Sequence, residues 1–550
     1  MRRGTTTVRV AVAGGAAVAL AALTTTPAAA YGRDAGGTRT GPSTVTTPYV
    51  LPVAPGVTTT SLLTVNDAGA ADNGFELVGI PDGIGTRRED GTVVAYVNHE
   101  LRATSGIVRR HGQTGAFVST LTIDPGTRRV VGGADLINPG IRYYDYALGT
   151  YSSSPSPAWT NADGTVAPAQ AAQFSRFCSG SLTDPFQLVS RSSLRGYAGQ
   201  LYFANEENGD ESRAFGVTTA GDAYQLPRLG LFSWENTLAA PTRGDTTLVM
   251  GNEDSGAGQL RAYIGTKRYT GSPVDKAGLT DGVLTVIDVA GNDAVTTDAQ
   301  FRAAYGRGTP VPVALNEIDW TQGGAAQNAE AAAKGLSLNR IEDGAFDPRN
   351  RNDYYFLTTE GGSGATVSTD PVTGAGNGRD GGGLWRLRFG DVDRPRLGAT
   401  LELLLDGSEE IGLNKPDNMT IDSRGNLLIQ EDPGGNVSVA RIVAYRIADG
   451  AIGTVARFDP ARFSRDAAIA NGPEFLTQDE ESSGIVPASD EFGRDTFLFD
   501  AQVHTPKNLP AGTGPGTVEE YVENGQLLLL AVRSWTAVYG SPAPHGGPDD

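Results

Sequence analysis

The chain has 550 residues, of which 63 are acidic and 44 are basic, so its formal net charge is −19. This balance argues against a nucleic-acid-binding protein, because phosphate backbones are bound mainly by Lys and Arg. Abundant carboxylates suit hard cations such as calcium, although a solvated acidic surface that aids solubility accounts for most of them.

Residues 1–30 have the pattern of an export signal. Arg2, Arg3 and Arg9 precede an apolar segment that ends in a small-residue cleavage site. The first two arginines are compatible with twin-arginine export, and ordinary secretion stays open. Cleavage would leave 41 basic against 63 acidic residues, a net charge of −22. No later segment is long and apolar enough to span a bilayer, so we expect a soluble, secreted protein.

Short apolar runs separated by turn residues fill the chain from residue 48 to residue 540, and they predict one all-β domain. A polar, Gly/Thr-rich segment over 31–47 precedes it, and we expect a flexible leader there. Residues 541–550 are rich in Pro and Gly and predict a disordered tail. One helix is predicted over 324–334. The predicted strands are 92–97, 200–204, 247–251, 282–289, 353–358, 426–430, 495–499 and 526–532.

Many short strands without long βαβ alternation indicate a radial array of four-stranded sheets. We therefore expect a β-propeller of about six blades. Larger insertions are predicted near 139–172, 265–280 and 363–382, and the predicted helix is a further insertion.

Cys178 is the only cysteine in the chain. An unpaired cysteine in a secreted protein calls for an explanation. It is either a small buried apolar residue or a thiolate that binds a metal. The surrounding residues 173–181 leave both interpretations open.

Acidic clusters recur at the ends of the predicted strands. Each cluster alone is more typical of a solvated turn than of a binding site. In a propeller, however, corresponding strand ends meet at one mouth of the central channel, where many carboxylates would repel one another unless they are protonated or bridged by cations. The pattern predicts a polynuclear metal site in which carboxylates favour calcium and the thiolate favours iron or zinc. The clusters are Asn98–Glu100, Asn205–Asn208, Asn252–Asp254, Arg340–Asp343, Lys415–Asn418, Gln430–Asp432 and Asp479–Ser483.

Several other chemistries are excluded by missing motifs. The chain contains no Gly-x-Ser-x-Gly elbow, no Walker loop and no His-Glu-x-x-His motif. Its four histidines are too scattered for a His-based zinc site. For His99 and His504, which lie near acidic clusters, an ordinary structural role and a role in orienting metal ligands are both open.

Together, these motifs resemble the PhoX-type alkaline phosphatases. They occur in the family's order over roughly residues 75 to 510, and the segments around Cys178 and Asp417 are the specific ones. The motifs are Arg176–Ser179, Glu206–Asn208, Arg340-x-Glu342, Pro416–Asn418 followed by Asp422-x-x-Gly425, Gln430-x-Asp432 and Glu481-x-x-Gly484.

The resemblance implies a secreted, monomeric β-propeller that hydrolyses small-molecule phosphomonoesters at a cluster of two ferric and three calcium ions. Under this reading Cys178 is an iron ligand, Glu342 is an iron or calcium ligand with a catalytic role, and Arg340 contacts the substrate phosphate. The remaining acidic ligands that the resemblance implies are Glu206, Glu207, Glu253, Asp417 and Glu481. One departure is Asp343, which stands where the family has an aromatic residue.

Two other functions remain open from the sequence. The stretch around Asp417 is also reminiscent of the gluconolactonase-type propellers, which indicates a calcium-dependent lactonase-like hydrolase. A non-catalytic, calcium-stabilised extracellular binding propeller is the other alternative.

Overall fold

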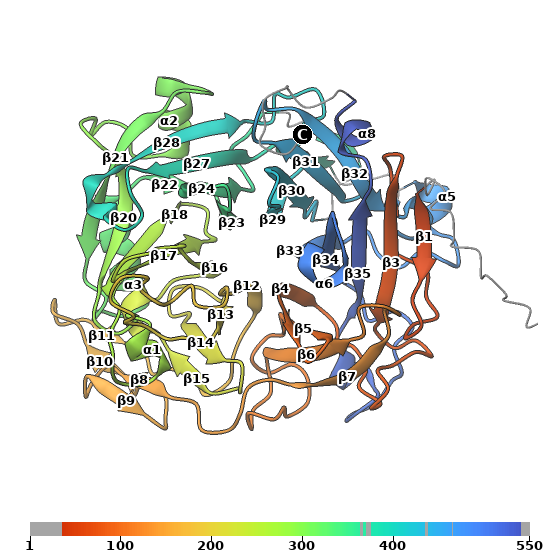
Figure 1. Cartoon of the computed structure of the whole chain (residues 1–550), viewed down its shortest axis with the longest axis horizontal. Helices are drawn as coiled ribbons and strands as arrows, with labels where there is room; N and C mark the ends of the chain where they lie inside the picture. The colour runs from red at the N-terminus through yellow and green to blue at the C-terminus, as the bar shows by residue number, and fades with distance from the viewer. Residues whose placement is uncertain (1–35, 364–366, 370–375, 435–437, 465, 541–550) are drawn as a thin grey trace, which may run out of the picture. The chain divides into compact units, whose positions relative to one another are not determined.

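The computed structural model describes residues 36–363, 367–369, 376–434, 438–464 and 466–540 (Figure 1). The predicted signal peptide, the first residues of the predicted leader and the predicted tail lie outside these residues. No helix in the described part of the chain is long and apolar enough to cross a membrane.

The described strands build six sets of four, which we number as blades in chain order. Four sets are separate sheets of four or five strands, and two are joined into one nine-stranded sheet through β21 (Val311–Ile318). Blade 1 contains β4 (Pro81–Glu89), β5 (Thr92–His99), β6 (Phe117–Ile123) and β7 (Val130–Asp135). Blade 2 contains β12 (Phe177–Leu182), β13 (Leu201–Glu206), β14 (Ala214–Thr218) and β15 (Ala223–Gln225).

The other four blades repeat this antiparallel order. Blade 3 contains β16 (Trp234–Ala239), β17 (Thr246–Glu253), β19 (Arg261–Thr266) and β20 (Val283–Val289). Blade 4 contains β23 (Ile341–Asp347), β24 (Asn350–Thr358), β27 (Gly383–Phe389) and β28 (Ala399–Leu405). Blade 5 contains β29 (Pro416–Ile421), β30 (Asn426–Glu431), β31 (Arg441–Arg446) and β32 (Ile452–Phe458). Blade 6 contains β33 (Glu480–Pro487), β34 (Thr496–Val503), β35 (Asn524–Val532) and β3 (Val57–Thr64).

The first strand of each blade lies nearest the centre of the ring (Figure 1). These six innermost strands contact one another in a closed cycle, in the order β4, β12, β16, β23, β29, β33 and back to β4. The prediction of an all-β propeller is therefore confirmed, with six blades among the described residues.

A strand from early in the chain closes the ring. β3 pairs antiparallel with β35, from Val57 opposite Val532 to Thr64 opposite Gln526. β1 (Gly37–Thr40) pairs parallel with β3, and β2 (Val50–Pro52) pairs with β32 of blade 5. Residues 37–40 thus extend blade 6, which differs from the expected flexible leader because their backbone finds partners along β3.

Each seam between neighbouring blades has its own hydrophobic core. The core between blades 3 and 4, for example, contains Met250 of β17 together with Phe356 and Trp385 of blade 4. Second strands such as β13 and β30 are buried along their whole length, and their apolar runs are the ones that sequence patterning detects. All eight predicted strands overlap observed ones.

The insertions are small elements attached to the blades. α3 (Gly324–Lys334) coincides with the predicted helix and contacts β20 and β21. The predicted insertion over 139–172 forms two short hairpins. The remaining elements are β8 (Tyr143–Asp145), β9 (Thr150–Ser152), β10 (Trp159–Thr160), β11 (Val166–Ala167), β18 (Gly258–Gln259), β22 (Ser337–Leu338), β25 (Val367–Thr369), β26 (Gly376–Gly378), α1 (Pro273–Lys276), α2 (Asp298–Tyr305), α4 (Pro460–Phe463), α5 (Ala467–Ala470), α6 (Ser489–Phe492), α7 (Val518–Tyr521), α8 (Trp535–Tyr539), and the 3₁₀ turns η1 (Pro227–Leu229) and η2 (Pro395–Leu397).

Candidate metal centre

The second residue of every innermost strand is an acid or the single cysteine. In five blades a β-bulge begins at this residue, so that two residues of the innermost strand oppose one of the second strand. In blade 6 the bulge comes two residues later. A bulge bends the strand and re-aims its side chains, which is why bulges are common beside active sites. We call these second residues the inner ring: Asp82, Cys178, Glu235, Glu342, Asp417 and Glu481.

A second set of polar residues follows the second strand of each blade. In all six blades the backbone N–H of this residue donates to the carbonyl of the residue that precedes the innermost strand, at 2.8–3.0 Å. The same local geometry therefore places one side chain per blade beside the inner ring. We call this set the outer ring: Glu100, Glu207, Asp254, Thr359, Asp432 and His504.

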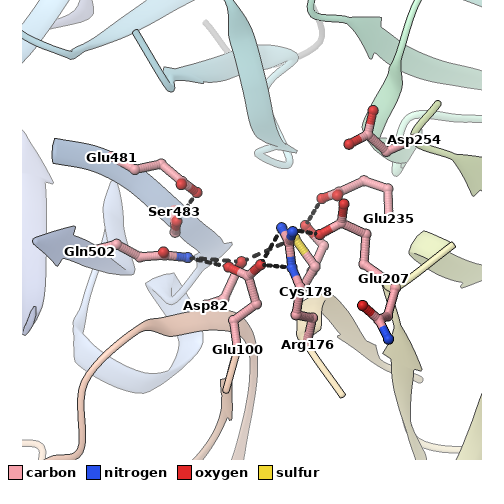
Figure 2. A network of polar contacts seen from close by, with 12 residues as sticks. Asp82, Glu100, Arg176, Cys178, Glu207, Glu235, Asp254, Glu481, Ser483 and Gln502 are labelled. Atoms are coloured by element: carbon pink, nitrogen blue, oxygen red, sulfur yellow. Dashed lines mark hydrogen bonds and ion pairs between the residues drawn. The ribbon is translucent and has the colours of Figure 1, made fainter. Parts of the chain in front are cut away.

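Cys178 lies between Asp82 and Glu100 on one side and Glu207 and Glu235 on the other (Figure 2). Its Sγ lies 3.2 Å from Oδ2 of Asp82, and its side chain is buried. The ligand atoms of Asp82, Glu100 and Cys178 lie within 4.8 Å of one another. The same holds for Cys178 with Glu207 and Glu235. Cys178 thus belongs to two adjacent candidate metal groups.

A third candidate group contains only carboxylates. The ligand oxygens of Glu235, Glu342 and Asp417 also lie within 4.8 Å of one another, and we call these residues the all-carboxylate group. Glu235 is shared with the neighbouring group that contains Cys178. The three groups therefore form a continuous row across the mouth of the ring.

Burial makes these acids expensive to ionise without cations. It raises the pKa of Asp82, Glu342 and Asp417 well above the usual range, and neighbouring carboxylates raise it further. Burial likewise raises the pKa of the Cys178 thiol, with Asp82 adding to the effect. Burial also raises the pKa of Glu235, to about 8.

The donor set fits bound cations. Oδ1 of Asp82 is buried and has no hydrogen-bond partner among the described residues. Oε1 of Glu342 accepts no hydrogen bond either, although Nη2 of Arg340 is 3.3 Å away. A buried acceptor without a donor is costly unless a cation or water satisfies it. Oxygen ligands suit calcium, and the thiolate suits a softer metal such as iron.

Two arginines lie at the mouth, each at the residue before an innermost strand. Arg176 and Arg340 both have left-handed backbone angles, with φ of 50° and 55°. Arg176 donates from Nε to Glu100 and from Nη2 to Glu207, both at 2.6 Å. Arg340 donates from Nε and Nη2 to Asp254 at 2.8 and 2.9 Å. No described residue accepts a hydrogen bond from Nη1 of either arginine, so both keep donors for an anionic ligand.

The structure brings together most of the site residues that the sequence predicted. Cys178, Glu207, Glu342 and Asp417 are members of the three groups. Glu481 lies in the inner ring but outside those groups; it accepts a hydrogen bond from Ser483 and lies 3.6 Å from Nε2 of His504. Arg340 lies beside Glu342, as its motif implied.

Glu206 and Glu253 are not brought to the cluster, which corrects their assignment as ligands. Both end a second strand and form buried ion pairs with an arginine at the start of the third strand. Glu206 pairs with Arg213, directly before β14, at 2.6 Å, and Glu253 pairs with Arg261, the first residue of β19, at 3.0 Å. Side chains alternate along a strand, so when Glu207 faces the mouth, Glu206 points into its own blade. The sequence cluster joined two residues with different roles.

Three members of the groups were missed as ligands, namely Asp82, Glu100 and Glu235. Glu100 lies in a cluster that the sequence singled out, but Asp82 and Glu235 are lone acids. The available signal was positional, because Asp82 and Glu235 are each the second residue of an innermost strand, as Asp417 is of β29. Of the two histidines that the sequence singled out, His504 belongs to the outer ring and lies beside Glu481. His99 is instead buried, with its ring nitrogens next to the carbonyl of Gly79 and the hydroxyl of Ser119. Burial lowers its pKa to about 3, so it is a neutral structural histidine.

Comparison with known proteins agrees with this geometry. Residues 217–486 match the family described as Alkaline phosphatase PhoX. This span includes Glu235, Arg340, Glu342, Asp417 and Glu481. No curated protein matches the chain.

Among solved structures, the chain is similar to Pseudomonas fluorescens PhoX in complex with vanadate, a transition state analogue. The identity is 13%, the match covers 89% of this chain and 97% of that chain, and the TM-score is 0.57, which shows a shared fold. A putative 6-phosphogluconolactonase from Bacteroides uniformis has 12% identity, coverage of 66% and 80%, and a TM-score of 0.25. A putative exo-beta-1,3-galactanase from Bifidobacterium bifidum has 10% identity, coverage of 85% and 92%, and a TM-score of 0.30. By the family match, residues 217–486 of the chain belong to the PhoX alkaline phosphatase family.

Proposed function

We propose that this protein hydrolyses phosphomonoesters at a cluster of iron and calcium ions held by the two rings. The observation that carries the proposal is the row of three candidate groups that share Cys178 and Glu235. Family membership supports a phosphoric monoester hydrolase, and the arrangement of donors supports the metals.

The chemistry of the donors divides the cluster. The two groups that contain Cys178 offer a thiolate with carboxylates, which suits iron. The all-carboxylate group offers only oxygen, which suits calcium. The family resemblance implies two iron and three calcium ions, and Glu481 with the outer-ring acids would complete their coordination.

The residues at the mouth would bind and orient the substrate. Bound cations supply charge that offsets the negative charge on a phosphoryl group during transfer. Arg176 and Arg340 would donate from Nη1 to the phosphate oxygens, because their other donors already engage carboxylates. Glu342 raises the pKa of Arg340 most strongly, and Asp254 adds to this, which keeps the guanidinium charged. The same ion pairs hold each arginine in one orientation, which reduces the entropy lost on binding.

The proposal also covers where the enzyme acts and its oligomeric state. The N-terminal pattern of the sequence supports export, so that the enzyme would act outside the cytoplasm on organic phosphoesters. Closure of the ring by β3 of the same chain supports a monomer, because the propeller needs no partner strand.

A combined metal analysis and phosphatase assay tests the proposal. The wild-type protein, expressed with ample iron and calcium, should contain both metals and hydrolyse p-nitrophenyl phosphate. Cys178→Ser should lose iron and most activity, because a hydroxyl is a poor substitute for a thiolate. Glu317→Gln is the control. Glu317 lies on β21 and forms an exposed ion pair with Arg396, so its substitution should change neither the metal content nor the activity. A wild-type protein without iron, or a fully active serine variant, would contradict the proposal.

A further inference from the structure

Asp343 accepts hydrogen bonds from three neighbouring blades at once. Nδ2 of Asn236 in blade 3 donates to its carboxylate at 2.6 Å, and the backbone N–H of Met419 in blade 5 donates at 3.1 Å. The backbone N–H of Gly344 in its own strand also donates, at 2.6 Å. The side chain is buried, with 6% exposure. One carboxylate therefore ties together the innermost strands of blades 3, 4 and 5.

The tied strands are the ones that carry the all-carboxylate group. Asn236 and Asp343 each directly follow a member of that group, and Met419 lies two residues after the third member. All of these residues lie at or directly after the bulges of their strands. The relative position of the three bulges, and hence of the three metal-facing carboxylates, therefore depends on the bonds to Asp343.

The other seams use a different device for the same purpose. In five blades the residue two positions before the outer-ring residue is an amide, which bonds to the bulge or first residues of the next blade's innermost strand. Examples are Asn98, which donates to the carbonyl of Cys178 at 2.7 Å, and Gln430, which donates to Oγ of Ser482 at 2.7 Å. Blade 4 has Leu357 at this position. The bond from Met419 to Asp343 supplies the link that the leucine cannot make.

We infer that Asp343 is a positioning residue that sets the spacing of the all-carboxylate group. The inference rests on the proposed function, because it assumes that cations occupy this group. Three N–H donors converge on one carboxylate, so the position requires a group that only accepts hydrogen bonds. An asparagine there would turn its own N–H₂ toward at least one donor. Partners that orient metal ligands typically change metal affinity about ten- to hundredfold when they are removed.

The test is a titration of chelated protein with calcium, in which the rise in melting temperature reports calcium binding. Asp343→Asn should weaken the apparent calcium affinity by about tenfold or more. Gln526→Leu is the control. Gln526 lies on β35 of blade 6, outside the blades that Asp343 links, and the substitution removes its buried hydrogen bonds to Tyr49 and Thr64. It should lower the melting temperature of the chelated protein but leave the calcium affinity within about twofold.

A double variant separates positioning from a loss of stability alone. In the combination of Asn236→Asp with Asp343→Asn the direction of their hydrogen bond is reversed, because the new asparagine donates to the new aspartate. The calcium affinity should recover at least in part. Wild-type affinity in Asp343→Asn would overturn this inference alone, as would failure of the double variant to recover. A wild-type protein that binds no metal would overturn the proposed function and this inference together.

Discussion

Removing the metals should reverse the response of this protein to pH. The chelated protein keeps buried acids that are protonated when folded, and burial raises the pKa of Glu235 from 4.5 to about 8 and that of Asp432 from 3.8 to about 7. Both folded-state values exceed the unfolded ones, so the stabilisation is fully present below about pH 4 and is lost as the pH rises through 7 and 8.

The magnitude follows from the number of protons taken up on folding. Near pH 6 each of the two groups binds about one proton more in the folded state, which costs about 1.4 kcal/mol of stability per pH unit and group. These two groups alone should therefore cost the chelated protein about 2 kcal/mol per pH unit or slightly more near pH 6. The buried carboxyls of Asp82, Glu342 and Asp417, whose pKa values are also raised, add to this loss. The metal-loaded protein should hold or gain stability, because metal ligands must be deprotonated.

Urea denaturation at pH 5, 6 and 7, with and without chelator, measures both slopes. Glu235→Gln removes one titrating group and should make the slope of the chelated protein shallower by about 1.4 kcal/mol per pH unit, whereas the surface variant Glu317→Gln should leave it unchanged. A chelated protein whose stability is constant or rises from pH 5 to pH 7 would refute the reasoning that these acids are buried and protonated without metal.

Three further outcomes follow from particular contacts. Arg340→Lys keeps the positive charge but loses the planar guanidinium. KM for p-nitrophenyl phosphate and the inhibition constant of phosphate should therefore rise about tenfold, which corresponds to about 1.4 kcal/mol of binding free energy, while the metal content stays constant. Unchanged steady-state kinetics would contradict a contact between Arg340 and the substrate. Glu206→Gln leaves Arg213 buried without a counter-charge and should cost about 3 kcal/mol in urea denaturation, with iron and calcium content unchanged; metal loss would return Glu206 to the ligand set. Thr60→Pro interrupts β3 opposite Leu529 and should destabilise ring closure by about 3 kcal/mol or more, and a wild-type urea midpoint would show that β3 is dispensable.

The sequence predicts the second strands of the blades better than the innermost ones. Strands such as β13 and β30 are buried on both faces and read as apolar runs, so their position follows from composition. The innermost strands do not show such runs, because their first residues face the metal centre. The strand β29, with the sequence Pro-Asp-Asn-Met-Thr-Ile, looks like a turn until its partners are known.

The same reason limits prediction of the site. Acidic clusters at strand ends place Glu207 correctly beside the cluster, but they cannot separate it from Glu206, whose side chain points the other way. Lone acids such as Asp82 and Glu235 give no local signal, because they reach the cluster through a bulge in their own strand that becomes visible only from its pairing with the second strand. Equivalence between blades becomes visible only when the register of each blade is known.

X-ray absorption at the iron edge of the purified protein tests the central claim most directly. We expect a sulfur ligand to iron in the wild-type protein, supplied by the single cysteine, and its loss in Cys178→Ser together with phosphatase activity. Iron bound only by oxygen and nitrogen in the wild type, or full phosphatase activity in protein that contains no iron, would contradict the claim that Cys178 anchors the catalytic metal cluster.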